Sequence, residues 1–172
     1  AFIGASPERL YKRAGKAFET EALAGTRPRG TSINEDKKFK DELLSSQKDR
    51  FEHSVVVDFI KAASAQICSN IEVDATPTLL TLKSGQHLLS SIRATLNKDT
   101  DDALILKVLH PTPAVGGDPT DKALKIISHF EPFKRGWYAG PIGYLGFNTA
   151  EFAVGIRSGL IANQKLYLYA GA

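Results

Sequence analysis

The stretch Gln47-Lys-Asp-Arg-Phe-Glu-His-Ser-Val-Val-Val-Asp-Phe-Ile-Lys-Ala-Ala-Ser-Ala-Gln-Ile-Cys-Ser69 carries the longest helical pattern in the chain. Its apolar residues recur at the helical period and form one stripe, made of Phe51, Val55, Phe59, Ala62 and Ala63. The stretch therefore predicts an amphipathic helix with one face turned toward a core.

Strand patterns lie on both sides of this helix. Short strands are expected at residues 2–5, 9–13 and 16–24, and again at 137–145, 151–161 and 165–170. Between them the sequence predicts a turn-rich loop at 25–33, a short helix at 34–44 capped by Asn34, strands at 71–73 and 78–82, and helices at 101–109 and 120–130. Residues 86–96 fit either a strand or a helix. The order strands, helices, strands predicts an α+β fold with antiparallel sheets and helices packed outside.

The composition is that of an ordinary globular protein, because 42% of the 172 residues are hydrophobic and 24% are charged. The formal net charge of +3 is spread along the chain, and acids interrupt the lysines at 37, 38, 40 and 48. We therefore expect a solvated face there and no nucleic-acid partner. No apolar run approaches the ~20 residues of a membrane span. A single cysteine, Cys68, excludes an internal disulfide and indicates a reducing compartment.

Both ends of the chain read as strand, and the sequence contains no Met. A domain usually frays into polar residues at its termini, whereas residues 1–5 and 166–172 are mostly apolar. We therefore expect residues 1–172 to be part of a single larger domain, truncated at both ends. A processed protein with tied-down termini is the alternative.

The most informative strand pattern is Glu151-Phe-Ala-Val-Gly-Ile-Arg157. Strict alternation places Phe152, Val154 and Ile156 on one face of the strand and Ala153, Gly155 and Arg157 on the other. The two small residues would leave room beside the guanidinium for a planar anion held by two hydrogen bonds. An edge arginine that reaches solvent is the alternative.

Three further positions could carry chemistry. Glu52 lies next to the apolar stripe, so its carboxylate is either solvated or turned inward toward a cation. Glu8 lies in a Ser-Pro-Glu turn and could be an exposed turn acid. The segment 110–117 is stiff at its prolines and flexible at its glycines, so it could present backbone amides to a ligand or simply connect two helices.

Six motifs follow one another in register along the chain. They are Ser6-Pro-Glu-Arg9, Glu21-Ala-Leu-Ala-Gly-Thr26 with Arg27-Pro-Arg-Gly30, Leu43-Leu-Ser-Ser-Gln-Lys-Asp-Arg-Phe-Glu-His53, His110-Pro-Thr-Pro-Ala-Val-Gly-Gly117, Glu131-Pro-Phe-Lys-Arg-Gly-Trp-Tyr-Ala-Gly-Pro-Ile-Gly143 and Phe152-Ala-Val-Gly-Ile-Arg157. Together they resemble the chorismate-utilising enzyme family, and within it most closely the isochorismate synthases. The resemblance covers essentially the whole chain.

The resemblance implies a large α+β domain in which two antiparallel sheets face each other, with helices outside and a deep cleft for chorismate and Mg²⁺. It implies addition of water at C2 of chorismate and loss of the C4 hydroxyl, a poor leaving group that an acid must protonate. The family pattern makes Glu8 this catalytic acid and Glu52 a ligand of the Mg²⁺ that holds a substrate carboxylate. The substrate-binding positions that it carries over are Gly25, Thr26, His87, Ala114, Val115, Ile156, Arg157 and Tyr169.

Two parts of the family pattern lie outside these residues. The resemblance places a lysine general base before Ala1 and a second Mg²⁺ carboxylate after Ala172, so residues 1–172 alone should not turn over chorismate. The missing parts of the domain, or a complementing chain, are the expected partners besides chorismate. One alternative is a catalytically incomplete remnant that serves as a structural subunit of a larger assembly. Another is a salicylate or anthranilate synthase, although the Ala114-Val115 pair favours simple water addition.

The downstream pathway stays open between quinone synthesis (menaquinone or phylloquinone), siderophores and salicylate. The motifs resemble those of plant enzymes as well as bacterial quinone-pathway enzymes. We therefore expect a cytoplasmic protein, with a plastid location as the alternative.

Overall fold

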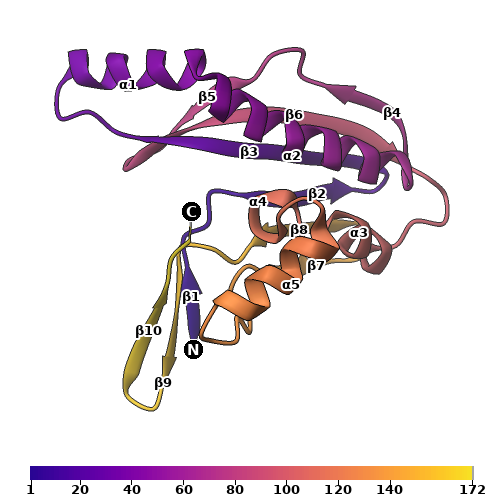
Figure 1. The fold of residues 1–172 in the computed structure, drawn as a ribbon. Helices are drawn as coiled ribbons and strands as arrows, with labels where there is room; N and C mark the ends of the chain where they lie inside the picture. Colours follow the sequence, from indigo (N-terminus) through magenta and orange to yellow (C-terminus); the bar gives the residue numbers. More distant parts are fainter. Residues whose placement is uncertain (172) are drawn as a thin grey trace.

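Two strands of twelve residues each, β3 (Ala17–Pro28) and β6 (Gly85–Leu96), lie side by side at the centre of the fold (Figure 1). A seven-stranded sheet forms around them with β2 (Arg9–Ala14), β4 (Cys68–Val73), β5 (Thr78–Thr81), β7 (Pro141–Leu145) and β8 (Thr149–Val154). Its order is β4-β6-β3-β2-β8-β7, with β5 paired to β6. The structure, a computed structural model, describes residues 1–171. All strand pairings within these residues are antiparallel, as predicted.

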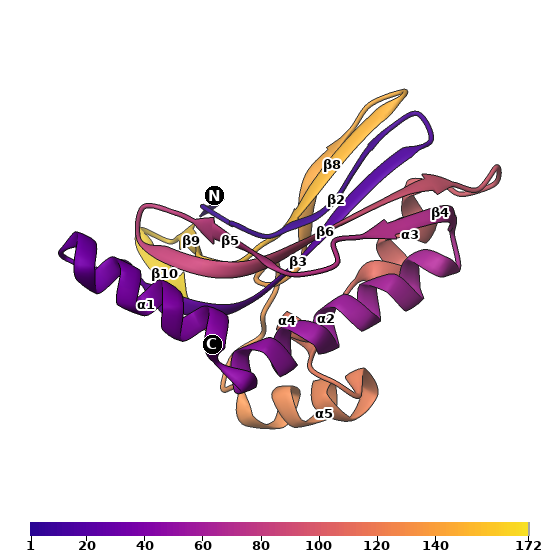
Figure 2. The same cartoon turned by 90° about the horizontal axis from the view of Figure 1, so that it is seen from above.

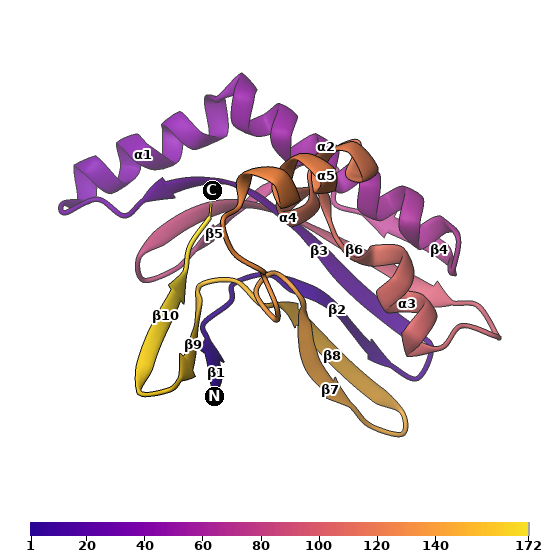
Figure 3. The ribbon, with the colours of Figure 1, turned by 60° about the horizontal axis from the view of Figure 1, so that its bottom comes forward.

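A second, three-stranded sheet consists of β1 (Phe2–Gly4), β9 (Ser158–Ala162) and β10 (Lys165–Tyr169), in the order β1-β9-β10. Figure 3 shows it extending away from the larger sheet. Two chain segments join the sheets, because β1 continues into β2 through residues 5–8 and β8 continues into β9 through residues 155–157. The first and last strands of the described chain thus belong to one small sheet, with β9 between them.

The helices are α1 (Ile33–Ser45), α2 (Gln47–Ala65), α3 (Asp102–Leu109), the short α4 (Pro113–Gly116) and α5 (Thr120–Phe130). Figure 2 shows them on the same side of the seven-stranded sheet. Serines begin the first two, since Ser32 Oγ accepts from the Glu35 N–H and Ser46 Oγ accepts from the Asp49 N–H, each at 3.2 Å. Ser32 rather than the predicted Asn34 is therefore the cap of α1. The α+β class is confirmed.

Residues 86–96, which fitted a strand or a helix, form a strand. Leu88, Ile92 and Leu96 point into the core and are 4% exposed or less, and Ser90 on the same face contacts α2. The ambiguity arose because Leu88-Leu-Ser-Ser91 places similar residues on both faces, which hides the strand alternation.

The buried face of α2 differs from the predicted stripe. The residues that face the core are Asp49, His53, Val56, Ile60, Ala63 and Ser64, whereas Phe51 is 70% exposed. The stripe was read from apolar residues alone, and two polar residues at the start of the helix are buried instead. Both find partners there, because Asp49 pairs with Arg27 at 2.7 Å and His53 Nε2 lies 2.9 Å from Ser90 Oγ.

Several predicted boundaries are also wrong. The loop expected at 25–33 is wrong as far as Pro28, because β3 continues to Pro28 and pairs with β6 up to that residue. The long helix ends at Ala65, and Cys68 begins β4. The strand expected at 137–145 begins only at Pro141. The strand expected at 151–161 is two strands, because β8 ends at Val154 and β9 begins at Ser158. In the part of the chain that the structure describes, no helix has the length and apolar character needed to cross a membrane.

Candidate active site

The two segments that join the sheets run side by side and carry two of the predicted site residues. The Ala5 N–H donates to the Arg157 carbonyl at 3.1 Å, and the Val154 N–H donates to the Glu8 carbonyl at 3.0 Å. Glu8 and Arg157 therefore lie on neighbouring backbone segments at the junction of the two sheets, although they are 149 positions apart in the sequence. This junction is the centre of the candidate site.

Glu8 is a buried carboxyl group, not an exposed turn acid. Glu8 is 6% exposed, and its backbone N–H donates to Ser6 Oγ at 3.2 Å. Burial raises the pKa of Glu8 from 4.5 to about 7, since the charged form is poorly solvated there. A hydrogen bond from Thr112 lowers this pKa and the nearby Glu21 carboxylate raises it. A carboxyl group with this pKa can donate a proton near neutral pH.

Three other predicted residues form one hydrogen-bonded chain. The Arg157 Nη2 atom lies 2.9 Å from His87 Nε2, and His87 Nδ1 lies 3.0 Å from Thr26 Oγ1. His87 is 4% exposed, whereas Thr26 and Arg157 are exposed. Burial and then the Arg157 charge lower the pKa of His87, so its ring is neutral at neutral pH. These hydrogen bonds therefore hold the Arg157 guanidinium and the Thr26 hydroxyl at the surface of the junction.

The backbone conformation at Gly25 places Thr26 in this chain. The pairing of β3 with β6 shifts register between Ala24 and Thr26, which is a β-bulge, and Gly25 has φ +76°. The bulge puts Thr26 opposite His87. A Cβ atom at Gly25 would lie 3.2 Å from Asp49 Cβ and 3.3 Å from Leu43 Cδ1, so the helix layer approaches the bulge closely.

The environment of Arg157 differs from the prediction. Alternation predicted one continuous strand, but the strand ends at Val154 and Arg157 adopts φ +48°. Gly155 leaves no open space either, because a Cβ atom there would lie 2.9 Å from the Trp137 carbonyl oxygen and 3.1 Å from that of Gly140. The side chain of Arg157 is thus directed by a backbone turn and by His87, and not by the two-residue period of a strand.

The remaining predicted substrate-binding residues make no hydrogen bond to Arg157, His87 or Thr26 within the described residues. Ala114 is exposed on α4, and Val115 packs against the core while its carbonyl accepts from Arg135 at 2.7 Å. Ile156 also packs against the core. Tyr169 stacks on Tyr138, with ring centroids 5.1 Å apart and planes 11° apart.

Glu52 lies on the exposed side of α2. Its carboxylate is 3.3 Å from Lys48, one turn earlier, and its side chain is 49% exposed. Of the two possibilities raised by the sequence, the structure has the solvated one. Residues 1–171 contain no group of three or more His, Cys, Asp or Glu side chains placed to hold a metal ion. A lone carboxylate paired with a lysine does not by itself fit a Mg²⁺ ion, which needs several oxygen ligands.

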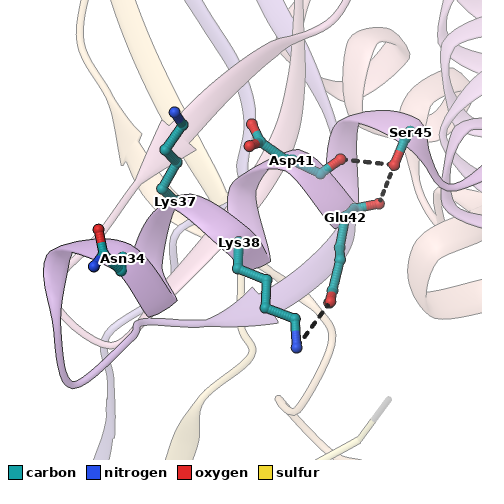
Figure 4. Close-up of a pocket in the computed structure, with 6 residues that line it drawn as sticks. All are labelled: Asn34, Lys37, Lys38, Asp41, Glu42 and Ser45. Carbon is teal, nitrogen blue, oxygen red and sulfur yellow. Dashed lines mark hydrogen bonds and ion pairs between the residues drawn. The ribbon is translucent and has the colours of Figure 1, made fainter.

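Figure 4 shows a surface depression on α1, lined by Asn34, Lys37, Lys38, Asp41, Glu42 and Ser45. Lys38 and Glu42 form an ion pair of 3.8 Å, and Ser45 Oγ donates to the Asp41 carbonyl at 2.7 Å. All six residues belong to one helix. The depression is the solvated face that the interrupted lysines predicted, and it contributes no residue to the junction.

Comparison with known proteins identifies the family. A family model described as chorismate binding enzyme matches residues 1–172. The chain belongs to the chorismate-binding enzyme family. It is 43% identical over 171 residues to isochorismate synthase MenF of Bacillus subtilis and 44% identical over 172 residues to the chloroplastic isochorismate synthase 2 of Arabidopsis thaliana. These alignments cover 99% of this chain, but 36% and 31% of the relatives, so the chain spans about a third of their length.

A solved structure has the same fold. The structure of MenF, the menaquinone-specific isochorismate synthase from Escherichia coli, superposes with a TM-score of 0.92 at 40% sequence identity. The match covers 99% of this chain and 40% of that one. Membership of the chorismate-binding family and the α+β architecture are therefore both shown, in agreement with the six motifs.

Within the chorismate-binding fold, sequence reasoning missed Thr112. It is 3% exposed, and its Oγ1 donates to Glu8 Oε1 at 3.3 Å across 104 positions. The sequence of segment 110–117 predicts a role for its backbone amides and small side chains, not for this hydroxyl. The available signal was a threonine held between Pro111 and Pro113, which fixes its backbone.

Proposed function

We propose that this chain forms part of the active site of an isochorismate synthase, an enzyme that adds water at C2 of chorismate with loss of the C4 hydroxyl. The observation that supports it most directly is the buried Glu8 at the sheet junction, with a pKa near 7. The C4 hydroxyl leaves poorly unless it is protonated, and an acid with a pKa near neutrality can supply the proton. The relatives' names support the same reaction.

In this proposal the hydrogen-bonded residues Arg157, His87 and Thr26 bind a carboxylate of chorismate. Arg157 keeps N–H groups that His87 does not use, so its guanidinium can bind the enolpyruvyl carboxylate. Thr26 and the Gly25 backbone contribute contacts beside it. His87 then orients Arg157 instead of lining the ring, because both of its nitrogens are engaged. Ala114, Val115, Ile156 and Tyr169 are proposed as the walls around the substrate.

For the metal, we assign Glu52 as one ligand of a Mg²⁺ ion. The acidic oxygen is of the kind Mg²⁺ prefers, and bound Mg²⁺ would orient and neutralise a substrate carboxylate. Residues 1–171 hold no cluster of three or more such side chains, and Glu52 is paired with Lys48, so this assignment needs further ligands that these residues do not bring together around Glu52. The proton donation by Glu8 does not depend on this assignment.

The test uses the natural full-length protein, incubated with chorismate and Mg²⁺, with products separated by chromatography. We expect isochorismate to form, and we expect Glu8→Gln to lower kcat by at least about 100-fold because general acid catalysis contributes 10²–10⁴. Glu42→Gln, on the exposed side of α1, is the matched control and should keep full activity. Full activity of Glu8→Gln would refute the acid assignment.

The identity of the product separates the alternatives. Salicylate or anthranilate as the main product would replace the proposed reaction by another one of the family. A folded full-length protein that binds chorismate but makes no product would favour the structural remnant. We place the protein in the cytoplasm or, in a plant, in the plastid, as the chloroplastic relative suggests.

A further inference from the structure

Glu8 has one hydrogen-bond donor to its carboxyl group within the described residues, and that donor is the Thr112 hydroxyl. The Oγ1 to Oε1 distance is 3.3 Å, and both residues are buried, at 3% and 6% exposure. Water therefore has little access to this pair, so the hydroxyl determines how the carboxyl group is held. A hydroxyl that donates to a carboxylate stabilises its ionised form.

The Thr112 hydroxyl binds Glu8 instead of capping α4. Thr112 occupies the cap position of α4, where a threonine side chain ordinarily accepts from a helix N–H, but its side chain makes no such bond. Its carbonyl does take part in the turn, accepting from the Gly116 N–H at 2.8 Å. The backbone of Thr112 is thus fixed by the turn while its side chain is free to face Glu8.

The segment around Thr112 is packed tightly enough to hold this position. A Cβ atom at Gly116 would lie 2.8 Å from Pro111 Cγ, so the turn closes directly onto the proline. Arg135 donates to the Val115 carbonyl at 2.7 Å and pairs with Glu131, which fastens the turn to the following segment. Thr112 is therefore part of a braced turn and not of a flexible loop.

We propose that Thr112 is a positioning residue for Glu8: its hydroxyl binds Oε1, which leaves Oε2 to carry the acidic proton. This inference rests on the proposed function for its catalytic meaning, but the hydrogen bond can be tested without turnover. The charged group that acts on Glu8 is Glu21 on β3, which raises its pKa. Glu21 itself pairs with Arg9 on β2 at 3.6 Å, and Arg9 also lies 3.1 Å from Glu151 on β8. Thr112 opposes the effects of burial and of Glu21.

The experiment measures the pKa of Glu8 by carbon-13 NMR of the side-chain carboxyl groups in the natural full-length protein, with Glu8→Gln used to assign the signal. Thr112→Val removes the hydroxyl but keeps the shape, and Thr112→Ser keeps the hydroxyl. We expect Thr112→Val to raise the pKa of Glu8 by about one unit, a tenfold change in its ionisation constant. Thr112→Ser should leave it near its original value.

An unchanged pKa of Glu8 in a folded Thr112→Val protein would overturn the proposal. If that variant does not fold, the test uses the unsubstituted protein. There the Thr112 methyl signal should titrate with the same midpoint as Glu8. A methyl signal that does not change with pH refutes the contact. Activity gives a separate readout. The alkaline limb of the kcat/KM profile should move upward with the pKa in Thr112→Val. If Glu8 proves not to be the catalytic acid, this limb stays in place while the NMR shift remains.

Discussion

Arg157 and His87, 70 positions apart, are joined by a hydrogen bond of 2.9 Å between Nη2 and Nε2. A guanidinium can only donate, so His87 Nε2 must accept and the ring proton must lie on Nδ1. Nδ1 then lies 3.0 Å from Thr26 Oγ1 as the donor of that hydrogen bond. One neutral imidazole thus orients two groups that can bind a carboxylate.

Loss of His87 should weaken substrate binding more than it slows the chemical step. We expect His87→Phe to raise the KM for chorismate about tenfold, because Arg157 and Thr26 lose their common support, with a smaller effect on kcat. Steady-state kinetics of the full-length protein provide the measurement. A protonated His87 cannot accept from Arg157, so KM should also rise as the pH falls below the usual histidine pKa of 6.5 and through the lowered pKa of His87. An unchanged KM in His87→Phe would contradict the positioning role, and His129→Phe on α5 is the matched control.

Glu8 should make the folding stability depend on pH. Its pKa is raised on folding to about 7, so the folded state binds the proton more tightly than the unfolded state does. The stability it contributes is complete below its ordinary pKa of 4.5 and is lost as the pH rises through about 7. Glu8→Gln cannot ionise, so relative to wild type it should gain up to about 3 kcal/mol between pH 4.5 and pH 8.5.

Urea unfolding of both proteins at a series of pH values measures this difference. The control is Glu42→Gln, the same substitution at an exposed position of α1. Parallel stability curves for Glu8→Gln and wild type would show that Glu8 is not held in a desolvated state.

The bulge at Gly25 should tolerate no side chain. Gly25→Ala combines the strain of φ +76° with contacts of 3.2 and 3.3 Å to Asp49 and Leu43, and we expect a loss of about 2–3 kcal/mol of stability. Gly15→Ala is a matched control, because Gly15 has φ +57° with nothing within 4 Å, so only the strain of about 1–2 kcal/mol applies. Equal losses in denaturant unfolding would contradict the close approach of the helix layer.

Asp102 should anchor α3 to the sheet. Its Oδ1 accepts from Tyr11 at 2.8 Å and from Arg13 Nε at 2.7 Å, and the side chains of Arg13 and Asp102 are each 13% exposed. We expect Asp102→Ala to lose about 2 kcal/mol because it leaves the partly buried Arg13 guanidinium and the Tyr11 hydroxyl without their common acceptor. The Arg13 guanidinium lowers the pKa of Asp102, so its contribution is present above pH 3.8 and fades as the pH falls through the lowered value.

Thermal unfolding at pH 7 tests the Asp102 prediction. Glu42→Ala, which breaks the exposed pair with Lys38, serves as the control and should change stability by less than about 0.5 kcal/mol. A similar small change for Asp102→Ala would mean that solvent reaches the Arg13 guanidinium.

Most element types, the α+β class and the family follow from the sequence alone, although residues 86–96 stayed ambiguous between strand and helix. Periodicity along the chain predicted α2 and most strands, and the six motifs identified the family before any contact was known. These features depend on residues close together in the sequence, so a linear reading can recover them. Local patterns fail where strand pairing overrides them, as at residues 25–28, where turn residues form a strand because β6 pairs with them.

Which residues contact one another depends on the tertiary fold. It buried Glu8 and gave it Thr112 as a partner, joined Arg157 to His87, and turned Phe51 outward while Asp49 and His53 faced the core. Burial and hydrogen bonding between distant segments control these outcomes, and neither leaves a period in the sequence. A pKa near 7 at Glu8 follows from lost solvent, which depends on the packing of segments more than 100 positions apart.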